Sequence, residues 1–266
     1  GYGIKAGTRN ELQGEEGVAH FCEHTTFKGT EHRRAWHIIN CLETVGGELN
    51  AFTNKEDTVY YSAILKEHTA KAVDLLSDIV FHSRYPQQEI DKEIEVICDE
   101  IESYNDSPAE LIYDLFENLI FKGHPLGHNI LGEASQLRTY TTATATAFTS
   151  RYYKPENAIF FAYGDIDFKR IVSLLKRTTK GFPASTPIIG DSQTACSLPP
   201  YEPQEKTIEK GTHQAHVMIG NRAYSVHDER RMALFLLNNI LGGPGMNARF
   251  NLSLRERHGL VYTVDS

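Results

Sequence analysis

His20-Phe21-Cys22-Glu23-His24 is the stretch of sequence that best indicates the fold of this chain. Residues four apart lie one above the other on a helix, so His20 and His24 can both reach one metal ion while Glu23 projects beside them. The order H-x-x-E-H reverses the commoner H-E-x-x-H and is a zinc peptidase signature. The pentapeptide therefore predicts a helix that binds zinc with a base next to the metal. The alternative is a surface helix with two solvated histidines.

A catalytic zinc ion takes three protein ligands, so a third ligand must come from elsewhere in the chain. The best source is residues 86–102, where Pro86 opens a predicted helix. Four isoleucines form one apolar stripe on it: Ile90, Ile94, Ile97 and Ile101. At 100° per residue, Glu93 and Glu100 fall together beside this stripe, where side chains are half-buried. The remaining glutamates of the helix are explained as solvated or helix-stabilising charges.

Segments on both sides of the pentapeptide resemble one known family. They are Ala6-Gly7-Thr8-Arg9-Asn10-Glu11, Phe27-Lys28-Gly29-Thr30, and residues 46–53, 123–127 and 153–157. With the pentapeptide, they are similar to the pitrilysin-type zinc peptidases, the inverzincins of peptidase family M16. The second half of the chain is most similar to the short branch of bacterial and mitochondrial-processing-peptidase-like members.

This resemblance implies one zinc ion per active site, bound by His20, His24 and Glu100. Glu100 follows His24 by 76 residues, and Glu93 stands seven positions before it. Glu93 is then an outer residue that orients a histidine ligand or supports Glu100. Zinc is expected to activate a water molecule, and Glu23 to accept its proton as general base.

Residues that contact the substrate are also implied by the resemblance. Arg255 and Tyr262 match an arginine and a tyrosine that reach the substrate from the second half of the family's fold. Physically, a guanidinium and a phenol are suitable donors to a peptide carbonyl or to the oxyanion formed from it. Asn50, Ala51 and Phe52 correspond to the edge strand on which substrates lie extended, bound through their backbone.

The predicted elements place helices against strands without strict alternation, which favours an α+β fold. Strands are expected at 2–7, 57–65, 158–163 and 215–220, and helices at 20–27, 34–45, 67–82, 87–104, 109–121, 141–152, 168–179, 227–241 and 246–257. The segment 181–206 is rich in Pro, Ser and Thr and reads as a linker. We expect a catalytic domain at 1–183, a linker at 184–206 and the start of a second α+β domain at 207–266.

The resemblance adds the overall architecture of this α+β fold. It implies the LuxS/MPP-like metallohydrolase fold, in which duplicated halves each have a mainly antiparallel sheet covered by helices. The second half is then incomplete in this chain. Both ends are expected to lie inside strands, the first near Tyr2 and the last at Thr263-Val264-Asp265-Ser266.

Composition excludes some classes of function. The chain is 40% hydrophobic and has no apolar run long enough to span a membrane. Its net charge of −8, without a basic cluster, argues against a nucleic-acid partner. Its four cysteines have no C-x-x-C spacing, which suits buried thiols better than a disulfide framework. We expect a cytoplasmic protein, with a periplasmic or organellar location as the alternative.

The predicted function is a zinc-dependent endopeptidase that hydrolyses peptides or unfolded polypeptides. A homodimer, or a complex with a sister subunit of the family, is expected from the resemblance. Two alternatives remain at this point. One is a non-catalytic partner subunit of the family, and the other is a zinc-binding or peptide-binding module without hydrolytic activity.

Overall fold

The computed structural model describes residues 1–182 and 198–266 of the chain. These residues form two compact units, Gly1–Met218 and Ile219–Ser266. Much of the predicted linker at 184–206 lies outside the described residues, and the predicted domain boundaries stay a prediction.

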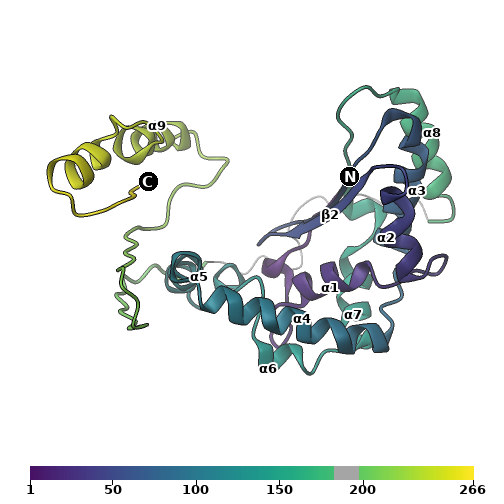
Figure 1. Ribbon diagram of the computed structural model, residues 1–266, viewed down its shortest axis with the longest axis horizontal. Coiled ribbons are helices and arrows are strands. Elements are labelled where there is room, and N and C mark those ends of the chain that lie inside the picture. The colour runs from purple at the N-terminus through teal and green to yellow at the C-terminus, as the bar shows by residue number, and fades with distance from the viewer. Residues whose placement is uncertain (183–197) are drawn as a thin grey trace. The chain divides into compact units, whose positions relative to one another are not determined.

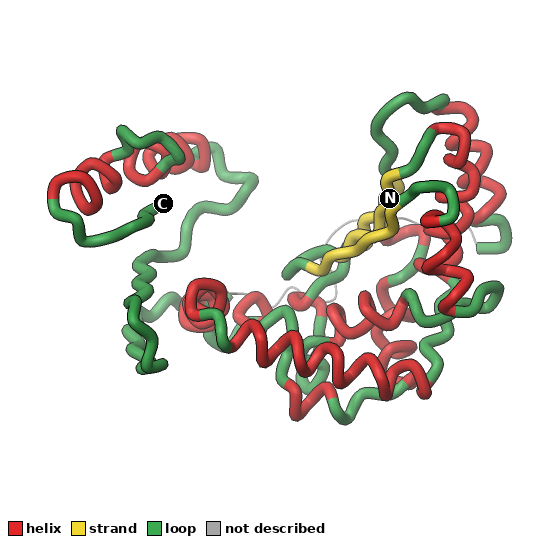
Figure 2. The backbone as a smooth tube through the Cα atoms, viewed as in Figure 1, coloured by secondary structure: helices red, strands yellow, loops and turns green. Residues whose placement is uncertain are grey.

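The first unit contains one antiparallel sheet of four strands in the order β2-β3-β1-β4. The strands are β1 (Tyr2–Ile4), β2 (Glu48–Thr53), β3 (Thr58–Ala63) and β4 (Ala158–Phe160). In register, Tyr2 lies between Tyr60 of β3 and Phe160 of β4, and Ala51 of β2 lies beside Tyr60. The predicted antiparallel sheet, yellow in Figure 2, is therefore confirmed. In the strand order, β2 forms one of its two edges.

Helices cover the inner face of this sheet, so the α+β fold is confirmed (Figure 1). They are α1 (Val18–Thr26), α2 (Ala35–Glu43), α3 (Thr69–Phe81), α4 (Gln87–Asn105), α5 (Pro108–Ile120), α6 (Ala134–Leu137), α7 (Thr142–Tyr152) and α8 (Phe168–Thr178). Short 3-10 turns join them: η1 (Thr8–Asn10), η2 (Lys66–His68), η3 (Pro125–Gly127) and η4 (Pro155–Asn157). Helix α1 packs against α4, α7 and β2, which places the pentapeptide at the centre of the unit.

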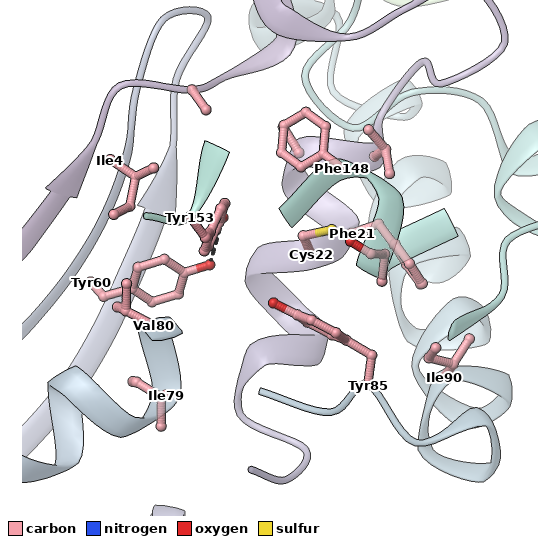
Figure 3. Close-up of a cluster of buried hydrophobic side chains, with 14 of the residues drawn as sticks. Ile4, Phe21, Cys22, Tyr60, Ile79, Val80, Tyr85, Ile90, Phe148 and Tyr153 are labelled. Carbon is pink, nitrogen blue, oxygen red and sulfur yellow. Dashed lines mark hydrogen bonds between the residues drawn. The ribbon is translucent and has the colours of Figure 1, made fainter. Parts of the chain in front are cut away.

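The hydrophobic core lies between the inner face of the sheet and the helices. Tyr60 of β3 is fully buried, and its hydroxyl lies 3.0 Å from that of Tyr153. Figure 3 shows these two side chains next to each other. On the facing side, Phe21 and Cys22 of α1 are fully buried near Phe148 of α7. The isoleucine stripe predicted on α4 is buried as well. Burying these apolar side chains supplies most of the free energy that holds α1 in place.

The opposite face of the sheet is more exposed. Phe52 lies beside Val59 in register, and Ile159 lies beside Gly3, all on the face away from Tyr60. Phe52 is 44% exposed and Ile159 is 74% exposed. Asn50 shares this face with Phe52 because strand residues two apart point the same way. The edge strand β2 thus offers both its backbone and one row of side chains to a ligand.

The second unit differs from its sequence prediction. It contains α9 (Arg231–Gly242) and one π-helix, η5 (Asn251–Arg257). The strand predicted at 215–220 is wrong, and so is the expectation that the chain ends within a strand at 263–266, because both stretches are irregular. A strand requires a neighbour to pair with, and residues 198–266 contain no strand that could serve as one.

Among the residues that the structure describes, Cys22, Cys41 and Cys98 are free thiols, and Cys22 and Cys98 are buried. Cys196 lies outside the described residues. No helix within 1–182 or 198–266 is both long and apolar enough to cross a bilayer.

The turn that follows α1 is tied to α3 by a buried carboxylate. Asp78 accepts hydrogen bonds from Thr30 Oγ1 at 2.7 Å, from His32 Nδ1 at 2.6 Å and from Arg33 Nη1 at 2.6 Å. Burial by itself raises the pKa of Asp78, but these three donors together outweigh it and lower the pKa below its usual 3.8. The turn at residues 29–34 is therefore fixed to the body of the unit.

Asp78→Asn is expected to destabilise the first unit by about 2 kcal/mol at pH 7, because a buried charged acceptor is lost. A lowered folded pKa stabilises the protein above the unfolded pKa of about 3.8, and this stabilisation is lost as the pH falls through the folded value. The difference between wild type and variant should therefore shrink as the pH falls below about 4. Urea unfolding, followed by the fluorescence of the single tryptophan, Trp36, measures this difference in the free energy of unfolding. A difference that stays constant, or an equal loss in the exposed control Asp99→Asn, would contradict this account.

Candidate metal centre

Helix α1 begins at a backbone turn that only glycine can make easily. Gly17, its N-cap, has φ +88°, and an added Cβ would lie 2.7 Å from the Cα of Gly132. The first amide groups of the helix are satisfied from outside it. The buried carboxylate of Glu11 accepts hydrogen bonds from Gly17 N at 3.1 Å and Ala19 N at 3.0 Å. Burial raises the pKa of Glu11 well above its usual value, and these two amide donors oppose that rise only in part.

From this start, α1 carries His20 and His24 on one face. Their ring centroids are 4.6 Å apart. Glu100 of α4 completes the group: its Oε2 lies 3.4 Å from His24 Nε2, and its Oε1 lies 3.9 Å from His20 Nε2. The three ligand atoms all lie within 4.8 Å of one another. The structure thus brings together the three residues that the sequence analysis proposed as metal ligands.

This donor set fits zinc. Two imidazoles and one carboxylate form a common catalytic zinc site, with a fourth position left for water. Bonds of about 2.0–2.2 Å in tetrahedral geometry place neighbouring ligand atoms roughly 3.3–3.5 Å apart. The 3.4 Å separation of His24 Nε2 and Glu100 Oε2 already has this value. His20 Nε2 lies 3.9 Å from the other oxygen of Glu100, and one ligand atom from each residue lies within 4.8 Å of the others, so the three side chains would have to move closer together around an ion.

The burial of His20 gives a second reason to place a metal here. Its side chain is 8% exposed, its Nδ1 has no hydrogen-bond partner among the described residues, and its Nε2 is too far from Glu100 for a hydrogen bond. Burial, followed by the nearby His24, lowers the pKa of His20 to about 4. His20 is therefore neutral at neutral pH, which is the form that coordinates metal.

His24 sits between two carboxylates. Its Nδ1 lies 3.0 Å from Glu93 Oε1, while Nε2 faces Glu100. Burial by itself lowers the pKa of His24, but the hydrogen bonds with Glu100 and Glu93 outweigh it and raise the pKa to about 9. His24 is therefore protonated at neutral pH, and a metal ion bound at its Nε2 would have to displace this proton.

Glu93 has the position expected of an outer residue. Of the two roles predicted for it, orienting a histidine ligand or supporting Glu100, the geometry shows a contact with His24. Its second oxygen, Oε2, lies 2.6 Å from Lys28 Nζ. The Glu93 side chain is 11% exposed, so it is more deeply buried than predicted, because both of its oxygens are held between Lys28 and His24. The Glu100 side chain, at 44% exposed, is more exposed than the half-buried position that was predicted.

Glu23, the expected base, is 9% exposed and points to the end of β2. Thr53 Oγ1 donates a hydrogen bond of 2.6 Å to Glu23 Oε2. Burial raises the pKa of Glu23, and the hydrogen bond from Thr53 opposes that rise only in part. A general base works best when its pKa lies near the working pH, so a raised value suits the role.

The three residues expected to bind substrate lie on β2, at the edge of the sheet. Asn50 and Phe52 are exposed on the open face, whereas Ala51 points to the core side next to Tyr60. Thr53, the next residue, contacts Glu23. A peptide paired with this edge would therefore run past the expected base.

Arg255 and Tyr262 belong to the second unit. Arg255 lies in η5, and its Cζ is 5.7 Å from the centre of the Tyr262 ring. Both side chains line one pocket of that unit. Their approach to a substrate at the metal stays a prediction.

Two family models match this chain. One, described as Insulinase (Peptidase family M16), covers residues 1–134, and the other, described as Peptidase M16 inactive domain, covers residues 139–266. The first match alone is more than half of the 266 residues. The chain belongs to peptidase family M16. All of the metal-centre residues of this M16 chain lie in the first match, whereas Arg255 and Tyr262 lie in the second.

Curated relatives of the M16 chain come from several bacteria. The uncharacterized zinc protease YmxG of Bacillus subtilis is 35% identical over 266 residues, which cover 100% of this chain and 63% of the relative. An uncharacterized zinc protease of Rickettsia bellii is 36% identical over 262 residues, which cover 98% of this chain and 62% of the relative. The chain thus spans less than two thirds of the length of these relatives.

Solved structures of other proteins have the same fold. A protease from Helicobacter pylori matches with a TM-score of 0.81 at 22% identity, over 100% of this chain and 64% of the other. The periplasmic protease PqqL from Escherichia coli matches with a TM-score of 0.63 at 27% identity, over 70% of this chain and 21% of the other. The first likeness shows that the described residues share the fold of this protease.

Three residues of the M16 chain that shape the site were missed as such by the sequence analysis: Glu11, Lys28 and Thr53. Lys28 had a detectable signal, since it stands four residues after His24, just beyond the end of the same helix. Glu11 and Thr53 reach α1 from other elements, and only the folded structure reveals their contacts.

Proposed function

We propose that this chain carries the catalytic centre of a zinc-dependent endopeptidase that acts on peptides or unfolded polypeptides. The observation that carries the proposal is that His20, His24 and Glu100 converge from two helices beside the buried carboxylate of Glu23. Membership of family M16 and the zinc protease names of the relatives support it.

The residues divide the chemistry among them. His20, His24 and Glu100 would hold zinc, which when bound supplies a Lewis acid that polarises a carbonyl and acidifies water. Glu23 accepts the proton of the attacking water at Oε1, because Oε2 is already bound by Thr53. Glu23 then returns this proton to the nitrogen of the leaving amine. Glu93 holds His24 with Nε2 turned toward Glu100.

The substrate is proposed to bind as an added strand along β2. Backbone hydrogen bonds to the edge of β2 accept many sequences, which suits an enzyme for unfolded polypeptides. Asn50 and Phe52 offer side chains on the open face beside this edge. From the second unit, Arg255 and Tyr262 are proposed to donate hydrogen bonds to the scissile carbonyl or to its oxyanion.

Removal and return of zinc test the proposal in the full-length protein. Zinc-loaded protein is expected to cleave an unfolded polypeptide, treatment with a chelator should lower the rate at least about 100-fold, and added zinc should restore it. Cleavage that persists after metal analysis shows complete zinc loss would contradict the proposal. Protein that binds zinc tightly yet cleaves no peptide would favour a binding module instead.

A further inference from the structure

Lys28 is a charged residue of the first unit to which the proposed chemistry assigns no role. It lies just after α1, with its amide bonded to Thr25 O at 3.1 Å. Its side chain is only 25% exposed, and Nζ lies 2.6 Å from Glu93 Oε2. The next residues form the turn that Asp78 ties to α3. The backbone that carries Lys28 is therefore fixed on both sides, by α1 and by this turn.

The nearly buried carboxylate of Glu93 needs the ammonium group of Lys28 as a partner. A buried carboxylate is costly unless each of its oxygens has a strong partner. Oε1 has His24 Nδ1 at 3.0 Å, and Oε2 has the Lys28 ammonium. The contacts form a chain of three residues that runs from Lys28 through Glu93 to a proposed metal ligand. A change at Lys28 can thus reach His24 without touching it.

We infer that Lys28 is a positioning residue of the metal centre, whose ammonium fixes the Glu93 carboxylate so that His24 presents Nε2 to zinc. This inference rests on the proposed function, because it requires His24 to be a ligand. Outer partners of a histidine ligand set its orientation and basicity, and their loss typically weakens metal binding 10- to 100-fold.

Charge balance supports the same role. Glu23, Glu93 and Glu100 bring three carboxylates to one small region. With neutral histidines, a zinc ion offsets two of these negative charges and Lys28 offsets the third. A lysine at this position thus lets the centre hold zinc without an uncompensated buried charge.

Zinc affinity of the full-length protein, measured by competition with a chromophoric chelator, tests this role without any need for peptidase activity. Lys28→Met is expected to weaken zinc binding about 10- to 100-fold. Lys28→Gln serves as a second variant that keeps polarity but removes the charge, and should behave similarly. Lys28→Arg restores a cation and should stay within about threefold of wild type. The matched control is Lys92→Met, next to Glu93 on α4 but 70% exposed.

A double-mutant cycle with Glu93→Gln shows whether Lys28 affects zinc binding through Glu93 or through a general loss of stability. In the Glu93→Gln background, Lys28→Met should change zinc affinity by less than about threefold. Two results would overturn the inference. In the first, Lys28→Met and Lys28→Gln are folded by circular dichroism and bind zinc as tightly as wild type. In the second, the loss of zinc affinity in the double variant equals the product of the losses in the two single variants. Wild-type protein that binds zinc tightly but cleaves no peptide would contradict the proposed function instead. The comparison of zinc affinity between wild type and the Lys28 variants would still test the inference.

Discussion

Glu23→Gln is expected to lower kcat for peptide hydrolysis by about 10²–10⁴-fold while the zinc content stays at one ion per chain. The glutamine amide keeps the size of the side chain but cannot accept the proton of the attacking water. Zinc should remain bound because Glu23 is not among the three grouped ligands His20, His24 and Glu100. Single-turnover cleavage of a fluorogenic peptide, with metal analysis of the same sample, measures both quantities.

Two companion variants sharpen this result. Glu102→Gln changes an exposed glutamate of α4 and should leave kcat unchanged. Thr53→Val removes the hydroxyl that holds Glu23 Oε2 and should cause a smaller loss of kcat than Glu23→Gln, with Thr53→Ser close to wild type. If Glu23→Gln cleaves as fast as wild type with zinc bound, Glu23 is not the base.

Glu100→Gln is expected to weaken zinc binding roughly 150- to 900-fold, more than Glu93→Gln. Structural zinc sites have binding free energies of about 10–16 kcal/mol, so each of the four coordination positions contributes roughly 3–4 kcal/mol. An amide is a poorer zinc ligand than a carboxylate. Glu93 contacts the ligand His24 but is not itself one of the three grouped ligands, so its replacement should weaken binding only about 10- to 100-fold.

Chelator competition at fixed pH ranks the two glutamate variants. The pH must be held constant because metal binding displaces the proton from His24, whose pKa without metal is about 9. Equal zinc affinity in Glu100→Gln and Glu93→Gln, or a larger loss in Glu93→Gln, would show that the third ligand is assigned to the wrong residue.

Local periodicity predicted much of the metal centre. The i, i+4 spacing placed His20 and His24 on one helical face, and the isoleucine stripe placed Glu93 and Glu100 together on α4. Periodicity could not choose between these two glutamates, because it gives the face of a helix but not its distance from another helix. The family resemblance indicated Glu100 as the third ligand, and the packing of α4 on α1 brings Glu100 to the two histidines.

Contacts between elements distant in sequence were not predictable from the residues. Thr53 meets Glu23 because β2 packs on α1, and Glu11 caps α1 only through the turn at Gly17. The strand predicted at 215–220 failed for a related reason: an alternating apolar pattern indicates a strand only where a neighbour is present to pair with it.

The most direct test of the central claim is a zinc-edge anomalous difference map from crystals of the full-length protein grown with zinc. The account predicts one strong peak within about 2.0–2.2 Å of a ring nitrogen of His20, Nε2 of His24 and a carboxylate oxygen of Glu100. Glu93 should lie outside the bonded set, against His24 Nδ1. A peak bonded to Glu93 in place of Glu100, or zinc bound elsewhere with none between these histidines, would contradict it.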